Sequence, residues 1–334
     1  MRSISYSRAP DTASAVAAVS SDPTSDFLAG GTTEVDLLRQ NVLSPRRLVD
    51  INALPLTGVE STPDGGLRIG ALARMSEVAA APVVRERYPV IAQALELGAS
   101  AQLRHMASMG GNLMQRVRCS YFRDAESPCN KREPGTGCSA IDGFSRGHAV
   151  LGTSDHCIAT HPSDVAVALM ALDARVRTQG PESVQEEHVY AIDGFYLLPG
   201  HTPHREHPMA HGELITAIEV PAAPVARNSL YLKVRDRESY EFALASVAVA
   251  LSLVDHTVAD VRIALGGVAT KPWRARRAED FLIGAVAERA NFVQAARVEL
   301  ADATPTAMNA FKVTLAQRAI VRALETLSAG GSPA

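Results

Sequence analysis

The sequence predicts a mixed α+β protein of about two domains, and three observations support this fold class. The chain has 334 residues, of which 46% are hydrophobic and 21% charged, the usual composition of a globular protein. Near its start, an apolar stub beginning at Phe27 runs into Gly30-Gly31 and then into an amphipathic stretch with Val35 and Leu38, the order of a strand, a turn and a helix. Near its end, the strand-like runs FALASVAVALSL and VADVRIALGGVA precede the amphipathic helical pattern AMNAFKVTLAQRAIVRALETL.

Three units follow one another along the chain. Residues 1–56 are expected to form a small α/β unit that carries the Gly30-Gly31 loop. Residues 57–222 are expected to form a larger α+β unit with a second glycine loop and all the cysteines. Pro221 and Pro224 mark a linker, because proline interrupts regular structure. Residues 225–334 then hold the two strand-like runs and the C-terminal helices.

Charge and hydropathy exclude several classes of protein. The formal net charge is −3 and the pI about 6.4, whereas a nucleic-acid binder needs a concentrated basic face. No uninterrupted apolar run approaches the ~18 residues of a membrane span. The N-terminal stretch lacks the charged, apolar and small-residue order of a secretion signal. We therefore expect a soluble protein with neither a nucleic-acid partner nor a membrane span.

Two glycine loops are candidate phosphate sites. In FLAGGTTE, Gly30 and Gly31 allow close approach of a ligand to backbone N–H groups, and the following threonines add hydroxyls. The second loop, SMGGN, contains Gly110 and Gly111 and offers another set of backbone donors. Each loop alone is more often a simple turn than a phosphate site. The G-x-G-x-x-G and G-x-x-x-x-G-K-[ST] patterns are absent, which disfavours a Rossmann dinucleotide site and an ATPase.

All four cysteines fall between Cys119 and Cys157, with gaps of nine, eight and eighteen residues. Such grouping in an otherwise cysteine-free chain indicates shared coordination of a metal centre. Tetrahedral zinc sites usually contain a close C-x₂₋₄-C pair, which is missing here, whereas iron–sulfur clusters tolerate long loops between ligands. From Arg116 to Gly147 the segment contains Gly, Pro, Ser and Asn without sustained periodicity, which predicts a loop that a bound group organises. Its cations would offset the negative charge of the thiolates: Arg116, Arg118, Arg123, Lys131 and Arg132. An iron–sulfur cluster is favoured; a zinc site and inert buried cysteines are the open alternatives.

Several motifs in this order resemble one known family. AGGTTEVDLL, SMGGN, HPSDVAVALMALDA, GELITAIEVP, the lysine of YLKVRDRESYEFALASVAVAL, and GGVATKPWRA are collinear over essentially the whole chain. This pattern is similar to the FAD-binding (medium) subunit of the xanthine dehydrogenase and carbon monoxide dehydrogenase family of molybdenum hydroxylases. The resemblance implies a PCMH/VAO-type FAD-binding domain over 1–222, in subdomains 1–56 and 57–222. It also implies a CO-dehydrogenase-flavoprotein-like α+β domain over 225–334.

The segment of about residues 116–158, called here the cysteine insert, adds roughly forty residues to the usual family pattern. Inserts of this kind, holding a [4Fe–4S] cluster near the flavin, occur in two relatives. One is the flavin subunit of bacterial molybdenum aldehyde oxidoreductases, and the other is hydroxybenzoyl-CoA reductase. The insert's sequence resembles the aldehyde oxidoreductase type; it reads RVRCSYFRD…SPCNKREPGTGC…LGTSDHCIATHPSD.

The resemblance also implies individual cofactor-binding residues. The first pyrophosphate loop maps to Ala29, Gly30, Gly31, Thr32, Thr33 and Glu34, and the second to Ser108, Met109, Gly110, Gly111 and Asn112. Asp164 is expected near the ribityl and phosphate groups, Ile215 against the flavin, and Lys233 close to the flavin. The expected cluster ligands are Cys119, Cys129, Cys138 and Cys157. No catalytic side chain of the chain's own is expected, because the cofactor carries the redox chemistry.

By resemblance, the chain is expected to be the electron-transfer subunit of an aldehyde oxidoreductase. A large subunit would hold the molybdenum cofactor and oxidise the aldehyde, and a small subunit would carry two [2Fe–2S] clusters. Electrons would reach FAD here and leave to an unknown external acceptor. One alternative is a hydroxybenzoyl-CoA-reductase-like subunit with inward electron flow; another is an assembly subunit with flavin and a structural zinc loop. The expected location is the cytoplasm, or the periplasm if a signal-bearing partner exports the chain.

A histidine-rich stretch, His201-x₂-His204-x₂-His207-x₃-His211, stands outside these motifs. Imidazole is a common metal ligand, but three interspersed prolines and the lack of an accompanying Cys or Asp favour a surface loop over a metal site.

Overall fold

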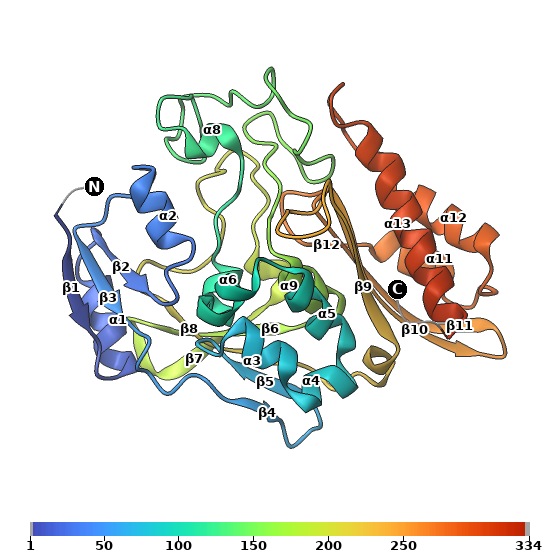
Figure 1. Cartoon of the computed structure of the whole chain (residues 1–334), viewed down its shortest axis with the longest axis horizontal. Coiled ribbons are helices and arrows are strands. Elements are labelled where there is room, and N and C mark those ends of the chain that lie inside the picture. Colours follow the sequence, from blue (N-terminus) through green and yellow to red (C-terminus); the bar gives the residue numbers. More distant parts are fainter. Residues whose placement is uncertain (1–2, 331–334) are drawn as a thin grey trace.

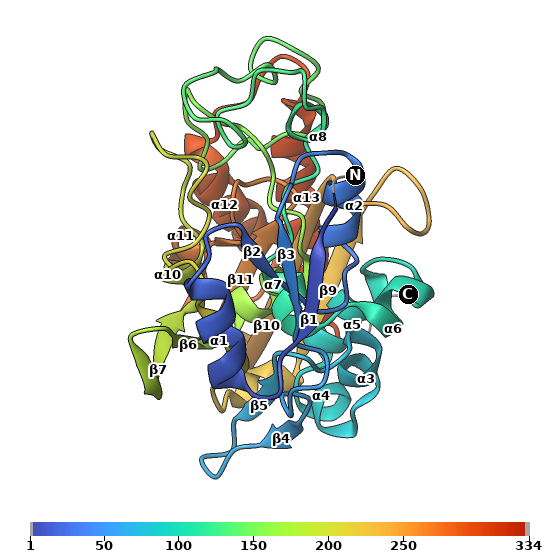
Figure 2. The same ribbon diagram turned by 90° about the vertical axis from the view of Figure 1, so that its left-hand side faces the viewer.

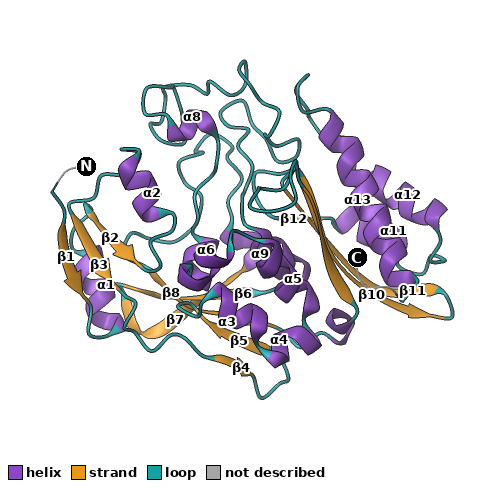
Figure 3. Cartoon of the chain, viewed as in Figure 1, coloured by secondary structure: helices purple, strands orange, loops and turns teal. Residues whose placement is uncertain are grey.

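The computed structural model describes residues 3–330, which form three β-sheets with helices packed against them (Figures 1 and 3). Within that range no helix is long and apolar enough to cross a membrane. The sheets follow one another along the chain in the order that the three predicted units suggested. The division at residues 56/57 and 222/225 stays a prediction, and the first sheet shares its core with Leu72 and Leu214 of the following segment.

The first sheet is parallel, with strand order β1-β3-β2. Figure 2 shows α1 beside it. Its elements are β1 (Ser5–Arg8), α1 (Thr12–Ser20), β2 (Ser25–Leu28), α2 (Glu34–Arg39) and β3 (Arg47–Asp50). The predicted strand, turn and helix around Gly30 are therefore β2, a turn, and α2. The turn lies at the carboxyl end of β2, the edge of a parallel sheet where ligands commonly bind.

The second sheet is antiparallel, with strand order β4-β5-β8-β6-β7. Its strands are β4 (Val59–Ser61), β5 (Leu67–Gly70), β6 (Arg175–Gly180), β7 (Ser183–Ala191) and β8 (Leu214–Val220). The accompanying helices are α3 (Met75–Ala80), α4 (Pro82–Arg87), α5 (Pro89–Leu97), α6 (Ala101–Met106), α7 (Met109–Leu113), α9 (Asp164–Ala171) and α10 (Ile192–Phe195). Helix α9 has an almost wholly apolar sequence and is buried on every side, because it packs against α5 and against strands of the third sheet.

The third sheet is antiparallel, with strand order β12-β11-β10-β9. Its strands are β9 (Ser229–Val234), β10 (Ala245–Val254), β11 (Thr257–Gly266) and β12 (Trp273–Arg274). Its helices are α11 (Arg276–Leu282), α12 (Arg289–Glu299) and α13 (Phe311–Ser328), with 3₁₀ turns at Pro224–Arg227 and Leu300–Asp302. Both strand-like runs near the chain end are therefore strands, and the amphipathic pattern is α13, whose apolar face covers β10 and β9.

The cysteine insert contains one short helix, α8 (Ser120–Arg123), and otherwise consists of turns and loops. Figures 1 and 2 show it as a lobe of loops on the same end of the molecule as α2. Its small core joins Val117, Phe122 and Cys129 to Leu37 of α2. The lack of regular structure was predicted from the scattered Gly, Pro and Ser, and this core explains how the loops keep one arrangement.

Arg274 connects the third sheet to helix α9. Its guanidinium is 3% exposed and donates hydrogen bonds to the carbonyl oxygens of Met170 (2.8 Å) and Ala171 (3.0 Å). It also forms ion pairs with Asp173 and with the buried Glu279. These contacts satisfy carbonyls at the end of α9, which lack partners within the helix.

Arg274→Met is expected to lower the free energy of unfolding by about 3 kcal/mol, because it leaves the Glu279 carboxylate buried beside an apolar side chain. Denaturant titration of the full chain followed by circular dichroism measures this. The matched control is Arg276→Met, since Arg276 is 57% exposed and contacts the same Asp173; its loss should stay under about 1 kcal/mol. Equal losses in the two variants would contradict a special role for the buried pair.

Candidate flavin site and cysteine cavity

The first glycine loop leads from β2 to α2 and passes close to the backbone at the end of α6. Gly31 has a φ of +70°, in the left-handed region that favours glycine. A Cβ on Gly30 would overlap the carbonyl oxygen of Met106. The loop can therefore approach this backbone only without a side chain at position 30.

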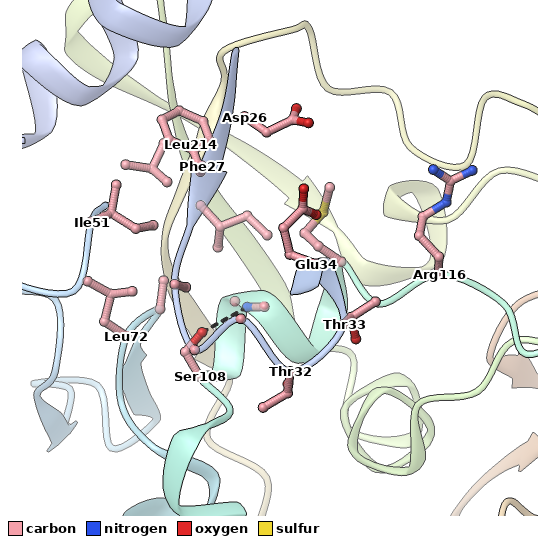
Figure 4. Close-up of a pocket in the computed structure, with 18 of the residues that line it drawn as sticks. Asp26, Phe27, Thr32, Thr33, Glu34, Ile51, Leu72, Ser108, Arg116 and Leu214 are labelled. Carbon is pink, nitrogen blue, oxygen red and sulfur yellow. Dashed lines mark hydrogen bonds between the residues drawn. The ribbon is translucent and has the colours of Figure 1, made fainter. Parts of the chain in front are cut away.

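The second glycine loop forms the start of α7. Ser108 caps this short helix, and its Oγ accepts a hydrogen bond from the Gly111 N–H (3.2 Å), drawn in Figure 4. The Gly110 N–H donates to Ala71 O (2.7 Å), which holds the loop against the second sheet. Because Gly30 lies against Met106 and Ala107, which directly precede Ser108, the two glycine loops are adjacent in space.

Two cavities meet at these loops. The first has a volume of about 320 Å³ and the second about 440 Å³. Thr32, Thr33 and Gly111 line both, so the loops form the passage between them. The predicted residues at the first cavity are Ala29, Gly30, Gly31, Thr32, Thr33, Glu34, Ser108, Gly110, Gly111 and Ile215. Those at the second are Thr32, Thr33, Gly111, Asn112, Asp164 and Lys233. Met109 lines neither, because its side chain is buried in the core.

The first cavity is apolar on one side and charged on the other. Figure 4 shows Ile51 and Leu72 on the apolar side and Asp26, Glu34 and Arg116 on the other. One carboxylate oxygen of Glu34 is buried without a hydrogen-bond partner in the described part of the chain. Burial, reinforced by Asp26, raises the pKa of Glu34 to about 7 against the opposing effect of Arg116. The cavity therefore offers a buried acceptor that a ligand hydroxyl could satisfy.

The second cavity contains a buried ion pair. The Lys233 ammonium is 2.8 Å from Asp164 Oδ2 and also donates to Leu97 O (3.1 Å). Tyr231 donates its hydroxyl to the other oxygen of Asp164 (2.7 Å). Burial raises the pKa of Asp164, and the charge of Lys233 opposes that rise. The sequence placed Asp164 and Lys233 at the cofactor separately, and the fold brings them together from α9 and β9.

Arg118 connects the second cavity to the cysteine insert. Its guanidinium lines the cavity, lies 5.1 Å from the centre of the Phe242 ring, and is 3.4 Å from Asp36. Burial, with the nearby charge of Arg123, lowers the pKa of Arg118 to about 10. Because Cys119 is the next residue, the insert begins at the wall of this cavity.

The four cysteines converge on one small space, called here the cysteine cavity. Cys119, Cys129, Cys138 and Cys157 all line this space of about 10 Å³, and all four thiols are free. The backbones of Cys129 and Cys138 pair as an isolated antiparallel bridge. Burial raises the pKa of Cys119 to about 11, and it also raises the pKa of Cys157. Among the side chains that the structure describes, no group of three or more His, Cys, Asp or Glu is arranged to hold a metal ion.

The histidine-rich loop packs against other segments instead of gathering its imidazoles. His201 Nδ1 lies 3.0 Å from Nε2 of His156, and His207 Nδ1 lies 3.3 Å from Phe195 O. His211 Nε2 is within 3.1 Å of two backbone carbonyl oxygens of the first unit. The main charged contacts of this loop are made by Glu206, which the sequence analysis did not single out.

Glu206 forms ion pairs with Arg116, at the first cavity, and with Lys131 (3.0 Å), at the cysteine cavity. Despite burial, these two cations hold the pKa of Glu206 below its ordinary value. Asp26 and Arg116 of the first cavity and His148 beside Cys119 were likewise absent from the predicted site residues. No local motif marks any of these residues, because their partners lie far away in the sequence.

Comparisons with known proteins identify the fold and the family. The family described as "FAD binding domain in molybdopterin dehydrogenase" matches residues 2–223, and the "CO dehydrogenase flavoprotein C-terminal domain" matches residues 230–327. The carbon monoxide dehydrogenase of Oligotropha carboxidovorans superposes with a TM-score of 0.76 at 22% identity, covering 98% of both chains. The predicted α+β fold, an FAD-binding domain followed by a CO-dehydrogenase-flavoprotein domain, is confirmed.

Two curated relatives cover most of the chain. The aldehyde oxidoreductase FAD-binding subunit PaoB of Escherichia coli (strain K12) is 46% identical over 97% of this chain and 98% of its own length. The glyceraldehyde dehydrogenase medium chain of Sulfolobus acidocaldarius is 29% identical over 84% of this chain and 81% of its own. The chain therefore belongs to the FAD-binding medium subunits of the molybdenum hydroxylase family, as the flavin subunit of a multi-subunit oxidoreductase.

Proposed function

We propose that this chain is the electron-transfer subunit of a molybdenum-dependent aldehyde oxidoreductase and that it holds FAD and a [4Fe–4S] cluster. In this proposal a large partner subunit with the molybdenum cofactor oxidises the aldehyde to a carboxylate. A small partner subunit with two [2Fe–2S] clusters passes the electrons to this chain, which delivers them to an external acceptor. The aldehyde assignment is supported by the 46% identity to an aldehyde oxidoreductase subunit over nearly the whole chain.

The two joined cavities support an extended dinucleotide across the glycine loops. Backbone N–H groups of both loops, with Thr32 and Thr33, would bind the pyrophosphate at the passage. The first cavity would hold the adenosine, because the unpaired Glu34 carboxylate suits a ribose hydroxyl. Ile215, which the sequence placed against the flavin, would then contact the adenosine end.

The second cavity would hold the isoalloxazine. Lys233 and Arg118 line it, and their positive charges favour a flavin that has gained electrons. Bound FAD would supply the ability to take up electrons one at a time from an iron–sulfur centre and to hold two of them for delivery to an acceptor. The chain's own residues bind it, and the buried Asp164–Lys233 pair keeps the lysine at this wall. A loop that begins at Arg235 and includes Phe242 covers the cavity next to Arg118.

The convergence of all four cysteines on one cavity is the observation that carries the cluster proposal. Up to eighteen residues lie between successive cysteines, yet all four line one space, and none of them forms a disulfide. Lys131, beside this cavity, and Arg118, preceding Cys119, supply positive charge that offsets thiolate ligands. Because Arg118 also lines the second cavity, a cluster here would lie close to the flavin, as electron transfer requires.

The complex would work in the cytoplasm, or in the periplasm if a partner subunit carries the export signal. We divide the chain into two domains. The FAD-binding domain covers residues 1–222, with an internal subdomain boundary near residue 56, and the C-terminal domain covers residues 225–334. The alternative is an assembly subunit in which the cysteines bind a structural zinc ion. Metal analysis distinguishes the two functions, because the alternative predicts zinc and no iron in this subunit.

Cys129→Ser is expected to remove about four iron atoms per chain from the complex, since it deletes one of four cluster ligands. The complex is purified anaerobically with its partner subunits, and iron, zinc and FAD are quantified beside low-temperature EPR after dithionite reduction. Ser120→Ala, at an exposed position in the same insert, is the control and should keep all the iron. Zinc at one atom per chain in the wild type would overturn the cluster proposal.

Gly30→Ala is expected to lower FAD content severalfold, because the added Cβ forces the first loop away from Met106 and out of register with the second loop. Absorbance at 450 nm of the purified complex, relative to protein, measures the retained flavin. Gly194→Ala is the matched control, since a Cβ there meets nothing within 4 Å. If Gly30→Ala retained the full flavin content, the loop would not be the pyrophosphate site.

Glu34→Gln is expected to change how stability depends on pH in the FAD-free chain. The pKa of Glu34 is about 7 in the folded state and 4.5 ordinarily, so the folded state binds the proton more tightly. The wild type therefore loses stability relative to the variant as pH rises from 4.5 to 7, by at most about 3 kcal/mol, and the difference is constant above 7. Denaturant titrations at several pH values measure it.

The exposed Glu86→Gln is the control for this series and should follow the wild type at every pH. Saturating FAD should reduce the pH dependence, because a hydroxyl donated to Glu34 favours its charged form. A Glu34→Gln profile parallel to that of the wild type would contradict the buried, unpaired state of this carboxyl.

A further inference from the structure

His148 lies at the end of the cysteine insert with its imidazole against Cys119. The Nε2 atom is 3.2 Å from the Cys119 Sγ, and the residue is 7% exposed. In the described part of the chain, Nδ1 is buried without a hydrogen-bond partner. Nε2 is therefore the ring nitrogen that faces a polar atom. A thiolate sulfur can only accept, so a hydrogen bond between the two requires the proton on Nε2.

The C-terminal helix holds His148 in this position through its backbone. The His148 carbonyl oxygen accepts hydrogen bonds from Asn309 Nδ2 (3.2 Å) and from Lys312 Nζ (2.9 Å). Lys312 is fully buried, and its ammonium also donates to the carbonyl oxygens of Gly147 (3.1 Å) and Gly267 (2.5 Å). Its three donors thus connect α13, the third sheet and the insert at a single point.

Burial lowers the pKa of Lys312 to about 7, whereas its three carbonyl acceptors favour the charged form, so the contact is costly as well as directional. Replacing Lys312 by a residue without an amino group would remove the hydrogen bonds that hold the carbonyl groups of Gly147 and His148. The His148 N–H also donates to Ser145 O (2.9 Å), which closes the turn that presents the imidazole. The ring position is therefore set by residues more than 150 positions further along the chain.

We propose that His148 is a positioning residue for the iron–sulfur centre: it donates an N–H···S hydrogen bond to Cys119 and thereby raises the reduction potential of the cluster. Lys312 and Asn309 hold the imidazole in place from the C-terminal domain. The inference rests on the proposed function, because it assumes the cluster bound by Cys119. Beyond the cluster itself, the inference assigns His148 and the C-terminal domain a role in setting the reduction potential of that cluster.

The direction of the effect follows from charge. Reduction adds an electron to a cluster that already carries negative thiolate ligands. A hydrogen bond to a ligand sulfur withdraws part of this charge and so favours the reduced state. Removing the donor lowers the potential, which makes the cluster harder to reduce, without removing any ligand.

The test compares His148→Phe and His148→Gln in the complete, anaerobically purified complex. Phenylalanine fills the space without a donor, whereas glutamine keeps an N–H group. EPR-monitored redox titration is expected to show a lower midpoint potential for His148→Phe and at least partial recovery for His148→Gln, at unchanged iron content. His201→Phe is the control, because this histidine contacts His156 and no cysteine; its potential should equal that of the wild type.

A second variant tests the connection to the C-terminal domain. Lys312→Met is expected to lower the potential in the same direction; if it fails to accumulate, Asn309→Ala takes its place, since it removes one donor to the same carbonyl. A His148→Phe complex with full iron and the wild-type potential overturns this inference and leaves the cluster proposal intact. A wild-type complex without iron in this subunit overturns the cluster proposal itself.

Discussion

The close approach of Gly30 to the Met106 carbonyl is the contact on which the rest of the site depends. It places the loop after β2 directly beside the loop that begins α7, although nearly eighty residues separate them. Backbone amides bind a pyrophosphate where several of them face one point, and the adjacency of the two loops provides such a point. The two cavities open on either side of this contact, so the same constraint also places the second cavity beside Arg118 and the start of the insert.

Charge compensation explains why the insert keeps one arrangement with almost no regular structure. Glu206, from the histidine-rich loop, forms ion pairs with Arg116 at the first cavity and with Lys131 at the cysteine cavity. Arg123 pairs with Asp36 of α2, and Arg146 donates from both terminal guanidinium nitrogens to the Asp236 carboxylate. Each of these contacts connects the insert to a different segment. The two Glu206 pairs are largely buried, so their geometry restrains the loops more strongly than the exposed Arg146–Asp236 pair does.

The sequence predicted those features that depend on local pattern. The strand, turn and helix at Gly30, both strands at the chain end and the irregular insert follow from periodicity and from turn residues, which act within a few positions. The resemblance added cavity residues as distant as Asp164 and Lys233. Glu206 was not predicted, Arg116 was expected to balance the thiolates and not to line the first cavity, and His148 was expected to be only structural. Their contacts arise from partners that the fold brings together. Met109, predicted among the loop residues, has its side chain in the core, since a loop motif does not say which way each residue points.

The C-terminal domain contributes to both proposed redox sites from the two strands that flank β10. Ser246 of β10 pairs with Lys233 of β9, which reaches the second cavity, and with Gly266, the last residue of β11. Gly267 then supplies a carbonyl to Lys312, which also holds His148. A displacement of this sheet would therefore move Lys233 at the second cavity and His148 at Cys119 together. In the proposed arrangement, this one sheet would therefore contribute charge to the flavin site through Lys233 and position the histidine beside Cys119 through Gly267 and Lys312.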